Sequence, residues 1–495
     1  MFSYCISKLS HPLLFASTST VAGTVAYCIS ENTTPTPSPT TPSNTVHDCL
    51  VIGGGIVGLA VGRELSVRGH STVLLEKTDA ICTGASSGNS GIGCTGYDAP
   101  AHSLERQLLR RSILRHPNLY RSLGLSYDHV NKCGALVVAW KEEQVQALDS
   151  IVEENHQAGD TEACFMERED LLTTEPALNP AARGAVWVPR EMVTEPWLVP
   201  IAYANNMLLN GGKIRLNADV CKVELRDKIW QVTLRSGDTI QARTVFNCAG
   251  LYGDRIDCLG VGSSNFTIQP RKGQFVVYSP MDESLAPQFI IQPVPTQRTK
   301  GVIVWKSVYG NIIVGPTAEE QDDRTDRTND AATIQMLREY GEQILPELKH
   351  CTVVGTYSGI RPATEHRDYQ IMHVPEKQWM TVGGIRSTGL TCASGISEYV
   401  ADLYEKNDAA AKNAGIAGEE DVPDALSLPV LPPYLPSLPL HSPHAVPNPM
   451  APDLHALSSD YYARNDGHVH VRFFLFVFDV LILLRKEFFF LISFF

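Results

Sequence analysis

The chain has 495 residues, of which 43% are hydrophobic and 19% charged, so it can bury a sizeable core and is neither disordered nor fibrous in composition. Its 54 acidic and 41 basic side chains leave a formal net charge of −13, and no basic tract is present, which argues against a general nucleic-acid binder. The twelve cysteines contain no CxxC pair, which excludes zinc-finger spacing and favours a reducing compartment over a disulfide scaffold. No other metal-ligand spacing stands out, and we predict no metal.

Residues 1–46 differ in composition from the rest of the chain and are predicted to be a leader followed by an extended Pro/Thr linker. The stretch from Pro12 to Ile29 is mildly apolar and leads into a proline-rich segment. Lys8 is the only basic residue, so the Arg-rich character of a mitochondrial presequence is missing. Mitochondrial targeting and an untargeted tail both stay open, and the expected location is mitochondrial or cytoplasmic.

Residues 47–76 predict a strand, a tight glycine turn, a helix and a second strand. The turn is Gly53-Gly54-Gly55-Ile56-Val57-Gly58, the helix covers Leu59–Arg68, and the second β-rich run, Ser71–Glu76, ends in an acid. Gly53 permits the turn, Gly55 lets the backbone approach a pyrophosphate, and Gly58 allows close helix–strand packing. The helix N-terminus offers N–H groups to phosphates, and Glu76 can accept hydrogen bonds from the ribose hydroxyls. This pattern predicts a dinucleotide site that disfavours NADP, but it does not decide between NAD and FAD.

Three further segments combine glycine with small or polar residues. Residues 84–96 hold three serines and an asparagine among five glycines, as suits a loop wrapped around a second phosphate and a flat ring. A β-meander predicted over Lys213–Arg243, with its hairpin at residues 235–238, leads into a buried strand that ends in a glycine turn at residues 250–253. Residues 381–391 form a third strand-to-helix turn before a helix predicted over Ala393–Tyr404, and its N–H groups could stabilise an electron-rich ligand edge.

Two inserted blocks separate these nucleotide segments. The first begins with a helix predicted over Ser103–Leu123. The second is rich in β runs, namely Gln274–Tyr278, Phe289–Pro293, Val302–Trp305 and Asn311–Val314. The charged run Glu319–Asp330 is predicted to be a solvated loop in which Arg324 and Arg327 pair locally with acids.

The C-terminal residues are not expected to join the folded core. Residues 409–470 are predicted to be a disordered segment, since ten of the thirty residues from Pro423 to Pro452 are proline. Residues 471–495 are strongly apolar, but Arg485, Lys486 and Glu487 interrupt them, which makes a poor membrane span. The tail is either an interfacial anchor or an artefact of the gene prediction, so peripheral membrane contact stays open and firm attachment is not expected.

Together these motifs resemble the FAD-dependent oxidoreductase superfamily with the D-amino-acid-oxidase-like fold. The resemblance is strongest to FAD-dependent glycerol-3-phosphate dehydrogenases and oxidases, and L-2-hydroxyglutarate dehydrogenases are also similar over much of the length. The segments that carry it are GGGIVG (53–58), NSGIGCTG (89–96), NCAGLYGD (247–254), RKGQFVVY (271–278), VYGNIIVGPTAEE (308–320), SGIRPATEHRDY (358–369) and GGIRSTGLT (383–391).

The resemblance implies an α/β fold, in which a Rossmann-like FAD-binding domain carries an inserted α+β substrate domain built on a large mixed or antiparallel sheet. The FAD-binding domain would comprise residues 47–96, 201–264 and 371–408, and the substrate domain residues 97–200 and 265–370. The residues expected at the FAD are Gly53, Gly55, Ile56, Val57, Gly58, Glu76, Lys77, Ser86, Ser87, Asn89, Ser90, Gly91, Val220, Ala249, Gly250, Gly384, Ile385, Arg386, Thr388, Gly389, Leu390 and Thr391.

A hydride acceptor such as flavin requires that the protein position the substrate carbon, and an anionic substrate calls for guanidinium groups. The candidates are Arg361 and Arg386. The family's counterpart of Arg361 contacts substrate, and the segment matching residues 385–386 lies against the flavin. Ser387 and Lys272 are further candidates for the anionic end of the substrate. A structural role, in which Arg361 holds loop carbonyls or Glu365, is the alternative.

Cys94 departs from the family pattern, because the similar enzymes usually carry a histidine base at this place. An ordinary thiol is mostly protonated at neutral pH, so Cys94 could act only with a depressed pKa, and His366 is the other candidate base.

The leading hypothesis is oxidation of sn-glycerol 3-phosphate to dihydroxyacetone phosphate, with quinone or oxygen accepting the electrons. A 2-hydroxyacid dehydrogenase, an amino-acid or amine oxidase, and a non-catalytic flavoprotein stay open as alternatives. An NAD(P)H-dependent reductase is disfavoured because the core holds no second GxGxxG.

Overall fold

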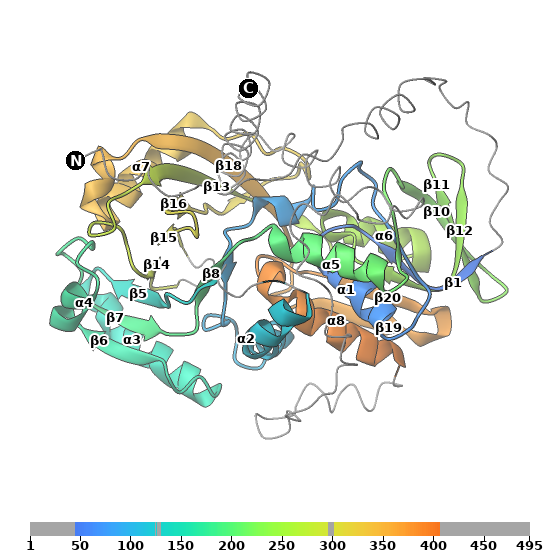
Figure 1. The fold of residues 1–495 in the computed structure, drawn as a ribbon, viewed down its shortest axis with the longest axis horizontal. Coiled ribbons are helices and arrows are strands. Elements are labelled where there is room, and N and C mark those ends of the chain that lie inside the picture. Colours follow the sequence, from blue (N-terminus) through green and yellow to red (C-terminus); the bar gives the residue numbers. More distant parts are fainter. Residues whose placement is uncertain (1–44, 124, 126–129, 296–300, 406–495) are drawn as a thin grey trace, which may run out of the picture. The chain divides into compact units, whose positions relative to one another are not determined.

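The computed structural model describes residues 45–123, 125, 130–295 and 301–405 (Figure 1). The predicted disordered segment 409–470 and apolar tail 471–495 lie outside these residues, and so does the predicted leader except for its last two positions. Within the described residues, no helix is both long and apolar enough to cross a membrane.

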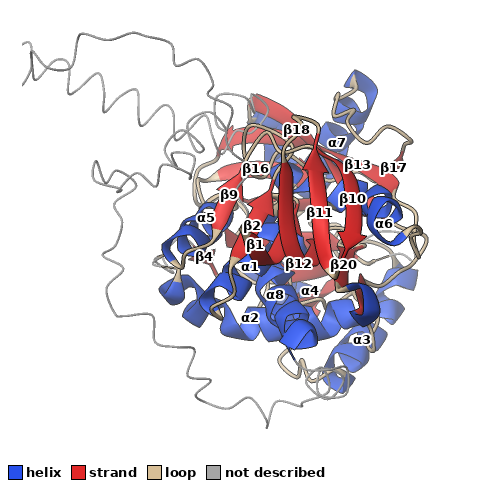
Figure 2. Cartoon of the chain, turned by 90° about the vertical axis from the view of Figure 1, so that its right-hand side faces the viewer, coloured by secondary structure: helices blue, strands red, loops and turns tan. Residues whose placement is uncertain are grey.

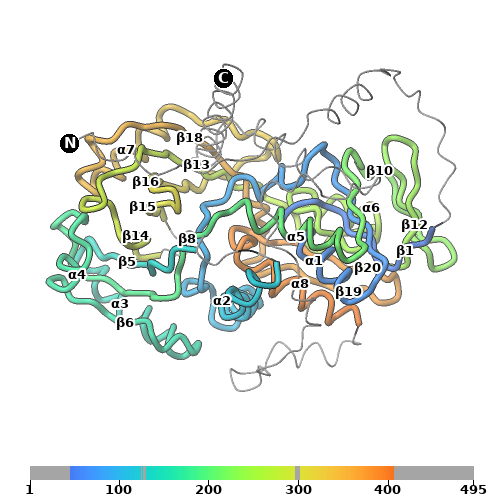
Figure 3. Tube along the Cα trace, in the orientation of Figure 1, coloured from blue at the N-terminus to red at the C-terminus, as the bar shows by residue number. Residues whose placement is uncertain are grey.

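The nucleotide segments come together in an eight-stranded sheet whose centre is parallel. Its order is β10-β11-β12-β1-β2-β9, and β20 pairs with both β12 and β19. The strands are β1 (Val46–Ile52), β2 (Thr72–Leu75), β9 (Lys213–Arg215), β10 (Val220–Arg226), β11 (Ile229–Leu234), β12 (Thr239–Asn247), β19 (Gln370–Val374) and β20 (Trp379–Gly383). Figure 3 shows how segments from the beginning, middle and end of the sequence meet around β1.

The continuous apolar run of β1 reflects burial on both faces of this sheet. Cys49 and Val51 pack into one core cluster, while Leu50 and Ile52 pack into another on the opposite face. The first cluster is formed with helices α1 (Ile56–Val67), α2 (Leu104–Ser122), α5 (Leu198–Leu209) and α8 (Gly389–Glu405), and the second with the meander strands and α6 (Gly253–Val261). Figure 2 shows α1, α2 and α8 gathered beneath β10–β12.

Three expectations about this half of the molecule need correction. The meander comprises only β10–β12, because Lys213–Arg215 pairs in parallel with β2 at the sheet edge. The last helix begins at Gly389, one turn before the predicted Ala393, so it follows the glycine turn directly. Helix α2 belongs by sequence to the inserted block 97–200, yet its apolar side chains pack into the same cluster as α8 and not against the second sheet.

The inserted blocks build a second, nine-stranded mixed sheet, as the resemblance implied. Its order is β17-β13-β16-β15-β14-β5-β7-β6, with β18 on β13, and β5 and β14 form its parallel pair. The strands are β5 (Ala135–Ala139), β6 (Cys164–Glu167), β7 (Gly184–Val188), β13 (Gln269–Pro280), β14 (Ile290–Pro293), β15 (Ile303–Lys306), β16 (Asn311–Gly315), β17 (Glu319–Glu320) and β18 (Val353–Ala363). The four predicted β runs of the second block correspond to β13–β16. Strands β14–β16 agree within one residue at each end, whereas β13 is longer than predicted and already begins at Gln269.

The remaining elements cover and connect the two sheets. Helix α7 (Ala331–Ile344) packs on one face of the second sheet through Leu337 and Ile344, and Leu148 of α3 (Glu142–Gln157) packs on the other face. A three-stranded sheet, β3 (Ile92–Gly93), β8 (Met192–Thr194) and β4 (Val130–Asn131), completes the structure together with α4 (Arg168–Thr174) and the short 3₁₀ helices η1 (Ala85–Gly88), η3 (Gly250–Tyr252), η4 (Pro346–His350) and η5 (Pro375–Lys377).

Candidate active site

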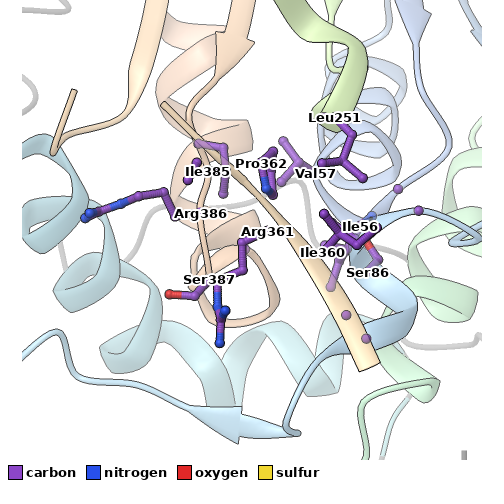
Figure 4. A pocket seen from close by; sticks show the side chains of 18 of the residues that line it. Ile56, Val57, Ser86, Leu251, Ile360, Arg361, Pro362, Ile385, Arg386 and Ser387 are labelled. Atoms are coloured by element: carbon purple, nitrogen blue, oxygen red, sulfur yellow. Dashed lines mark hydrogen bonds between the residues drawn. The ribbon is translucent and has the colours of Figure 1, made fainter. Parts of the chain in front are cut away.

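A cavity of about 1410 Å³ opens where the glycine turns of the first sheet meet β13 and β18 of the second (Figure 4). Ordinary small-ligand pockets measure roughly 300–1,000 Å³. The cavity is therefore large enough for an elongated dinucleotide together with a second, smaller molecule. Its wall is formed by all three predicted glycine-rich turns, by the loop that follows β2, and by the end of β18.

The first glycine turn has the geometry that the sequence predicted. Gly53 has a φ of +115°, which favours glycine, and its N–H donates to the Leu75 carbonyl at 2.8 Å. A Cβ added at Gly58 would lie 1.9 Å from the Gly53 carbonyl oxygen, so only glycine fits at this point of the helix. Gly55, Ile56 and Val57 line the cavity, whereas Gly58 lies behind them and supports the packing.

Glu76 is held rigidly beside this turn. One carboxylate oxygen accepts the Gly54 N–H at 2.7 Å, and the other accepts the Thr78 N–H at 3.0 Å and the Thr78 hydroxyl at 2.8 Å. The side chain is 7% exposed and borders the cavity. A fixed carboxylate at the end of the second strand suits the ribose hydroxyls of a dinucleotide.

The serine-rich loop folds back onto the start of α1. Ser86 Oγ accepts the Ile56 N–H at 3.0 Å, and Asn89 ties the loop by donating to the Ser86 carbonyl at 2.8 Å and accepting the Gly91 N–H at 2.7 Å. Ser86, Asn89 and Ser90 line the cavity. Ser87 and Gly91 do not line it; the Ser87 hydroxyl donates to the Gly84 carbonyl at 2.8 Å.

The other predicted cofactor residues lie along the same cavity. The cavity is lined by Lys77, Val220, Ala249, Gly250, Gly384, Ile385, Arg386, Thr388, Gly389 and Leu390. Because α8 begins at Gly389, its N-terminus and unpaired N–H groups face the cavity. Thr391 lies one layer behind, where its hydroxyl accepts the Cys94 N–H at 2.9 Å.

Arg361 presents a guanidinium to the part of the cavity that lies beside β13 and β18. It donates to the Thr317 carbonyl at 3.1 Å and makes long contacts of 3.5 Å to the carbonyls of Arg271 and Lys272. Burial, reinforced by the neighbouring Arg271, lowers its pKa to about 10. Among the described residues no carboxylate pairs with Arg361, so the site can accept an external anion. Figure 4 shows Arg361 and Ser387 pointing toward the same part of the pocket.

Arg386 is already paired. Its guanidinium donates to Glu105 of α2 at 2.7 Å, and the other Glu105 oxygen accepts the Thr388 hydroxyl at 2.7 Å. In Figure 4 its side chain points away from Arg361. Glu105 is 4% exposed and was missed by the sequence reasoning, since an acid in the first turn of a helix signals only favourable capping.

Lys272 does not reach the cavity, which corrects its assignment as a substrate ligand. Arg271 and Gly273 line the cavity, so the alternation of side chains along β13 turns Lys272 to the opposite face. There its ammonium lies 3.4 Å from Asp326 and donates to the Thr328 carbonyl at 3.2 Å.

The two candidate bases differ in position. Cys94 is half-buried in the cavity wall. His366 lies at the edge with its side chain 45% exposed and its Nε2 3.1 Å from the Asn265 carbonyl oxygen. Sequence reasoning missed Glu191, a cavity-lining carboxylate that is 1% exposed and accepts the N–H of Thr95 at 2.6 Å and its hydroxyl at 2.9 Å. No motif surrounds Glu191, so the sequence held no signal for it.

The prediction that Arg324 and Arg327 pair locally is wrong. Arg324 binds Asp254 and the Leu251 carbonyl, and Arg327 binds Ser87 and the carbonyls of Thr83 and Gly84. Both partners belong to the cofactor loops, more than sixty residues away in the sequence.

Comparison with known proteins agrees with this geometry. The model of the family described as "DAO: FAD dependent oxidoreductase" matches residues 48–403. The chain is 30% identical to glycerol 3-phosphate dehydrogenase of Caloramator mitchellensis over 73% of this chain and 74% of that protein, and 29% identical to mitochondrial L-2-hydroxyglutarate dehydrogenase of Bos taurus over 56% of this chain and 62% of that protein. The structure of L-alpha-glycerophosphate oxidase from Mycoplasma pneumoniae, solved with FAD bound, superposes with a TM-score of 0.67 and 25% identity, covering 73% of this chain and 95% of that one.

The cavity dimensions, the Glu76 carboxylate and the glycine turns fit FAD, and the family match spans most of the described residues. The chain therefore belongs to the DAO family of FAD dependent oxidoreductases and is an FAD enzyme of the glycerol-3-phosphate dehydrogenase and oxidase type.

Proposed function

We propose that this enzyme oxidises sn-glycerol 3-phosphate to dihydroxyacetone phosphate. The observation that carries the proposal is Arg361, a guanidinium in the cavity wall that is bonded to carbonyls and paired with no carboxylate of the described chain. A phosphate can take two parallel hydrogen bonds from such a group and compensate its charge. The similarity to a glycerol 3-phosphate dehydrogenase and to a glycerophosphate oxidase supports the same substrate.

Different residues of the cavity wall would bind different parts of the substrate. When bound, FAD supplies the hydride acceptor. Arg361 would hold the anionic end of the substrate, with the Ser387 hydroxyl as a second donor on the same side of the pocket (Figure 4). The ion pair between Arg386 and Glu105 leaves Arg361 as the stronger anion ligand, because a neutralised guanidinium attracts a second anion less.

The proton of the substrate hydroxyl needs an acceptor in the cavity wall. We propose Cys94 for this place, because it lines the cavity and because the family resemblance implies a histidine base at its position in the loop. His366 is only the second candidate, because it lies at the exposed edge of the cavity and its Nε2 already contacts the Asn265 carbonyl oxygen. Glu191 holds the neighbouring residue of the Cys94 loop in place, because its carboxylate accepts the Thr95 N–H at 2.6 Å.

One alternative substrate class is favoured by the same observation. A single guanidinium binds a carboxylate as well as a phosphate, and the chain is similar to L-2-hydroxyglutarate dehydrogenase. A 2-hydroxyacid is therefore the second candidate. For the electron acceptor we propose oxygen or a quinone, and for the location either mitochondria or the cytoplasm.

Anaerobic reduction of the bound flavin would test the proposal. Purified holoenzyme would be mixed separately with glycerol 3-phosphate, L-2-hydroxyglutarate and a panel of amino acids in a stopped-flow spectrophotometer, and bleaching of the visible flavin band would be followed. We expect rapid, saturable bleaching by glycerol 3-phosphate and none by unphosphorylated glycerol. Faster bleaching by a carboxylate substrate would move the enzyme to the hydroxyacid or amino-acid branch and refute the phosphate assignment.

A further inference from the structure

Residues 321–330, here called the strap, join β17 to α7 and cross from the second sheet to the cofactor loops. Three of its residues, Arg324, Thr325 and Arg327, line the large cavity. The strap, which was predicted to be a solvated loop, thus forms part of the cavity wall. Its contacts with both sheets suggest a role of its own.

Arg327 fixes the serine-rich turn. It donates to Ser87 Oγ at 2.8 Å, to the Thr83 carbonyl at 2.5 Å and to the Gly84 carbonyl at 3.1 Å. The same turn presents Ser86 Oγ to the Ile56 N–H at the start of α1. Arg327 therefore acts on the dinucleotide-binding helix through the turn, with one strap side chain satisfying three acceptors of the cofactor domain.

Arg324 fixes a second cofactor segment. Its two terminal nitrogens bind the two oxygens of Asp254 at 2.6 and 2.8 Å, and one of them also donates to the Leu251 carbonyl at 2.7 Å. The Arg324 and Asp254 side chains are only 12% and 10% exposed, so this bidentate pair is shielded from water and is worth more than a surface ion pair. Leu251 and Tyr252 of this segment line the cavity.

The strap is tied equally well to the second sheet. Gln274 of β13 donates to Asp330 at 2.8 Å, Lys272 donates to the Thr328 carbonyl at 3.2 Å, and the Ser358 hydroxyl of β18 donates to the Arg327 carbonyl at 2.5 Å. Strand β18 also touches the serine-rich turn directly, because a Cβ added at Gly359 would lie 2.3 Å from the Gly88 carbonyl oxygen. The turn is thus enclosed between β18, the strap and α1.

We propose that the strap is a clasp of the cofactor site, in which Arg324 and Arg327 hold two cofactor segments together and thereby slow the release of FAD. The two arginines are positioning residues, because each acts through the loops that it binds. The strap also shares β18 with Arg361, so it connects the cofactor turn to the strand that carries the substrate arginine. The assignment does not depend on which substrate the enzyme oxidises.

The first experiment measures FAD release from Arg327→Met and Arg324→Met holoenzymes. Release would be followed as the recovery of free-FAD fluorescence after dilution. Each variant loses several hydrogen bonds to a charged group, and we expect FAD to dissociate about tenfold faster or more. Arg327→Lys keeps the charge but cannot reach three acceptors, so its release rate should lie between those of the wild type and Arg327→Met.

Two control variants separate the clasp from general destabilisation. Thr328→Ala removes a side-chain bond to Asp326 that stays within the strap, and Arg226→Met removes an exposed arginine paired with Glu224. Both should release FAD at the wild-type rate. Unchanged release from both Arg324→Met and Arg327→Met, or equally fast release from Thr328→Ala, would overturn the proposal.

A second experiment keeps the proposal testable if an arginine variant fails to fold. Trypsin cleaves after arginine, and the wild-type strap offers Arg324 and Arg327 as sites that the described contacts protect. Cleavage after these two residues would be compared by mass spectrometry in holoenzyme and in protein stripped of FAD. We expect protection in the holoenzyme and cleavage at the strap once FAD is removed. Equal cleavage in both forms would overturn the proposal, because the strap would then be independent of the bound cofactor.

Discussion

The cofactor part and the substrate part of the cavity are built in different ways. Around the glycine turns, polar atoms satisfy one another over short distances in space, as in the Glu76 carboxylate that accepts the Gly54 N–H. In the substrate part a single guanidinium, Arg361, is held by carbonyls and left without a carboxylate among the described residues. The first part is held in place by hydrogen bonds among its own loops, whereas the second presents a guanidinium that forms no ion pair with a carboxylate among the described residues. The difference teaches that cofactor affinity comes from preorganised loops, whereas substrate affinity comes from a buried guanidinium that an anion can neutralise.

The largest effect on FAD binding is expected at Gly58, where the cofactor part has no space for an added methyl group. Gly58→Ala would place a methyl group 1.9 Å from the Gly53 carbonyl oxygen, which neither backbone segment can relieve cheaply. We expect protein without bound FAD or no soluble protein at all, measured as flavin absorbance per chain. Gly253→Ala is the matched control, because Gly253 does not line the cavity, its φ of −55° suits alanine, and an added Cβ would meet only the Phe266 ring at 3.5 Å, so flavin content should stay unchanged. Full flavin content in Gly58→Ala would break the view that the cofactor part is rigid.

In the substrate part, Arg361→Met removes a buried guanidinium that forms no ion pair with a carboxylate among the described residues. The KM of the anionic substrate should rise about hundredfold or more, because a buried charge partner is lost, while the flavin spectrum stays unchanged. Steady-state kinetics and visible absorbance would measure the two effects. Arg183→Met, which removes a half-exposed arginine paired with Glu142, serves as the control. A lost flavin spectrum in Arg361→Met would show that the two parts are not separable.

Glu76→Gln tests whether the cofactor part depends on a full carboxylate. Glu76 accepts hydrogen bonds on both oxygens, and an amide must turn its NH₂ toward one of those donors. FAD should bind about tenfold to hundredfold more weakly in titrations of the apoprotein. Glu283→Gln, at an exposed glutamate paired with Lys306, should bind FAD normally. Equal affinities for the two variants would remove Glu76 from the site.

Cys94→His would sharpen the description of the substrate part. If Cys94 occupies the place of the base, an imidazole there should accelerate flavin reduction about fivefold to tenfold at neutral pH and make the rate rise with pH near 6.5. The pH profile of anaerobic flavin reduction measures both effects. Cys94→Ser should be slower than the wild type. An unaltered pH profile in Cys94→His would contradict the assignment of Cys94 and favour His366 as the base.

The smallest effect concerns a buried acid behind the substrate part. Burial raises the pKa of Glu195, which hydrogen-bonds Tyr309 and the Trp197 N–H, from 4.5 to about 7. Between these pH values the folded protein holds a proton that the unfolded chain has lost, so the contribution of Glu195 to stability is fully present below about pH 4.5 and is lost as the pH rises to about 7. Glu195→Gln should abolish this loss and raise the Tm at pH 8 by a few degrees relative to the wild type, with less effect at pH 5. Thermal unfolding at the two pH values measures it, and an equal shift at both would contradict the assignment.

Much of the cofactor part was predictable because its signals are local. The strand–turn–helix pattern of residues 47–76 and the hairpin at residues 235–238 depend on residues that are neighbours in the chain. One boundary shifted because local propensity competes with packing: α8 begins at Gly389 although glycine is a poor helix former. Helix α2 was assigned to the wrong layer because its apolar stripe does not say which partner it covers.

The sequence by itself determined the dinucleotide turn, the family and the presence of two arginines near the site, because glycine spacing and backbone donors act within a few residues. Only the tertiary structure decided which cation is available. Glu105 pairs Arg386 across 281 residues of sequence, the strand alternation of β13 turns Lys272 away, and the strap carries Arg324 and Arg327 to the cofactor loops. A side chain's charge is read from its letter, but whether that charge is free for a ligand depends on partners that distant segments bring to it.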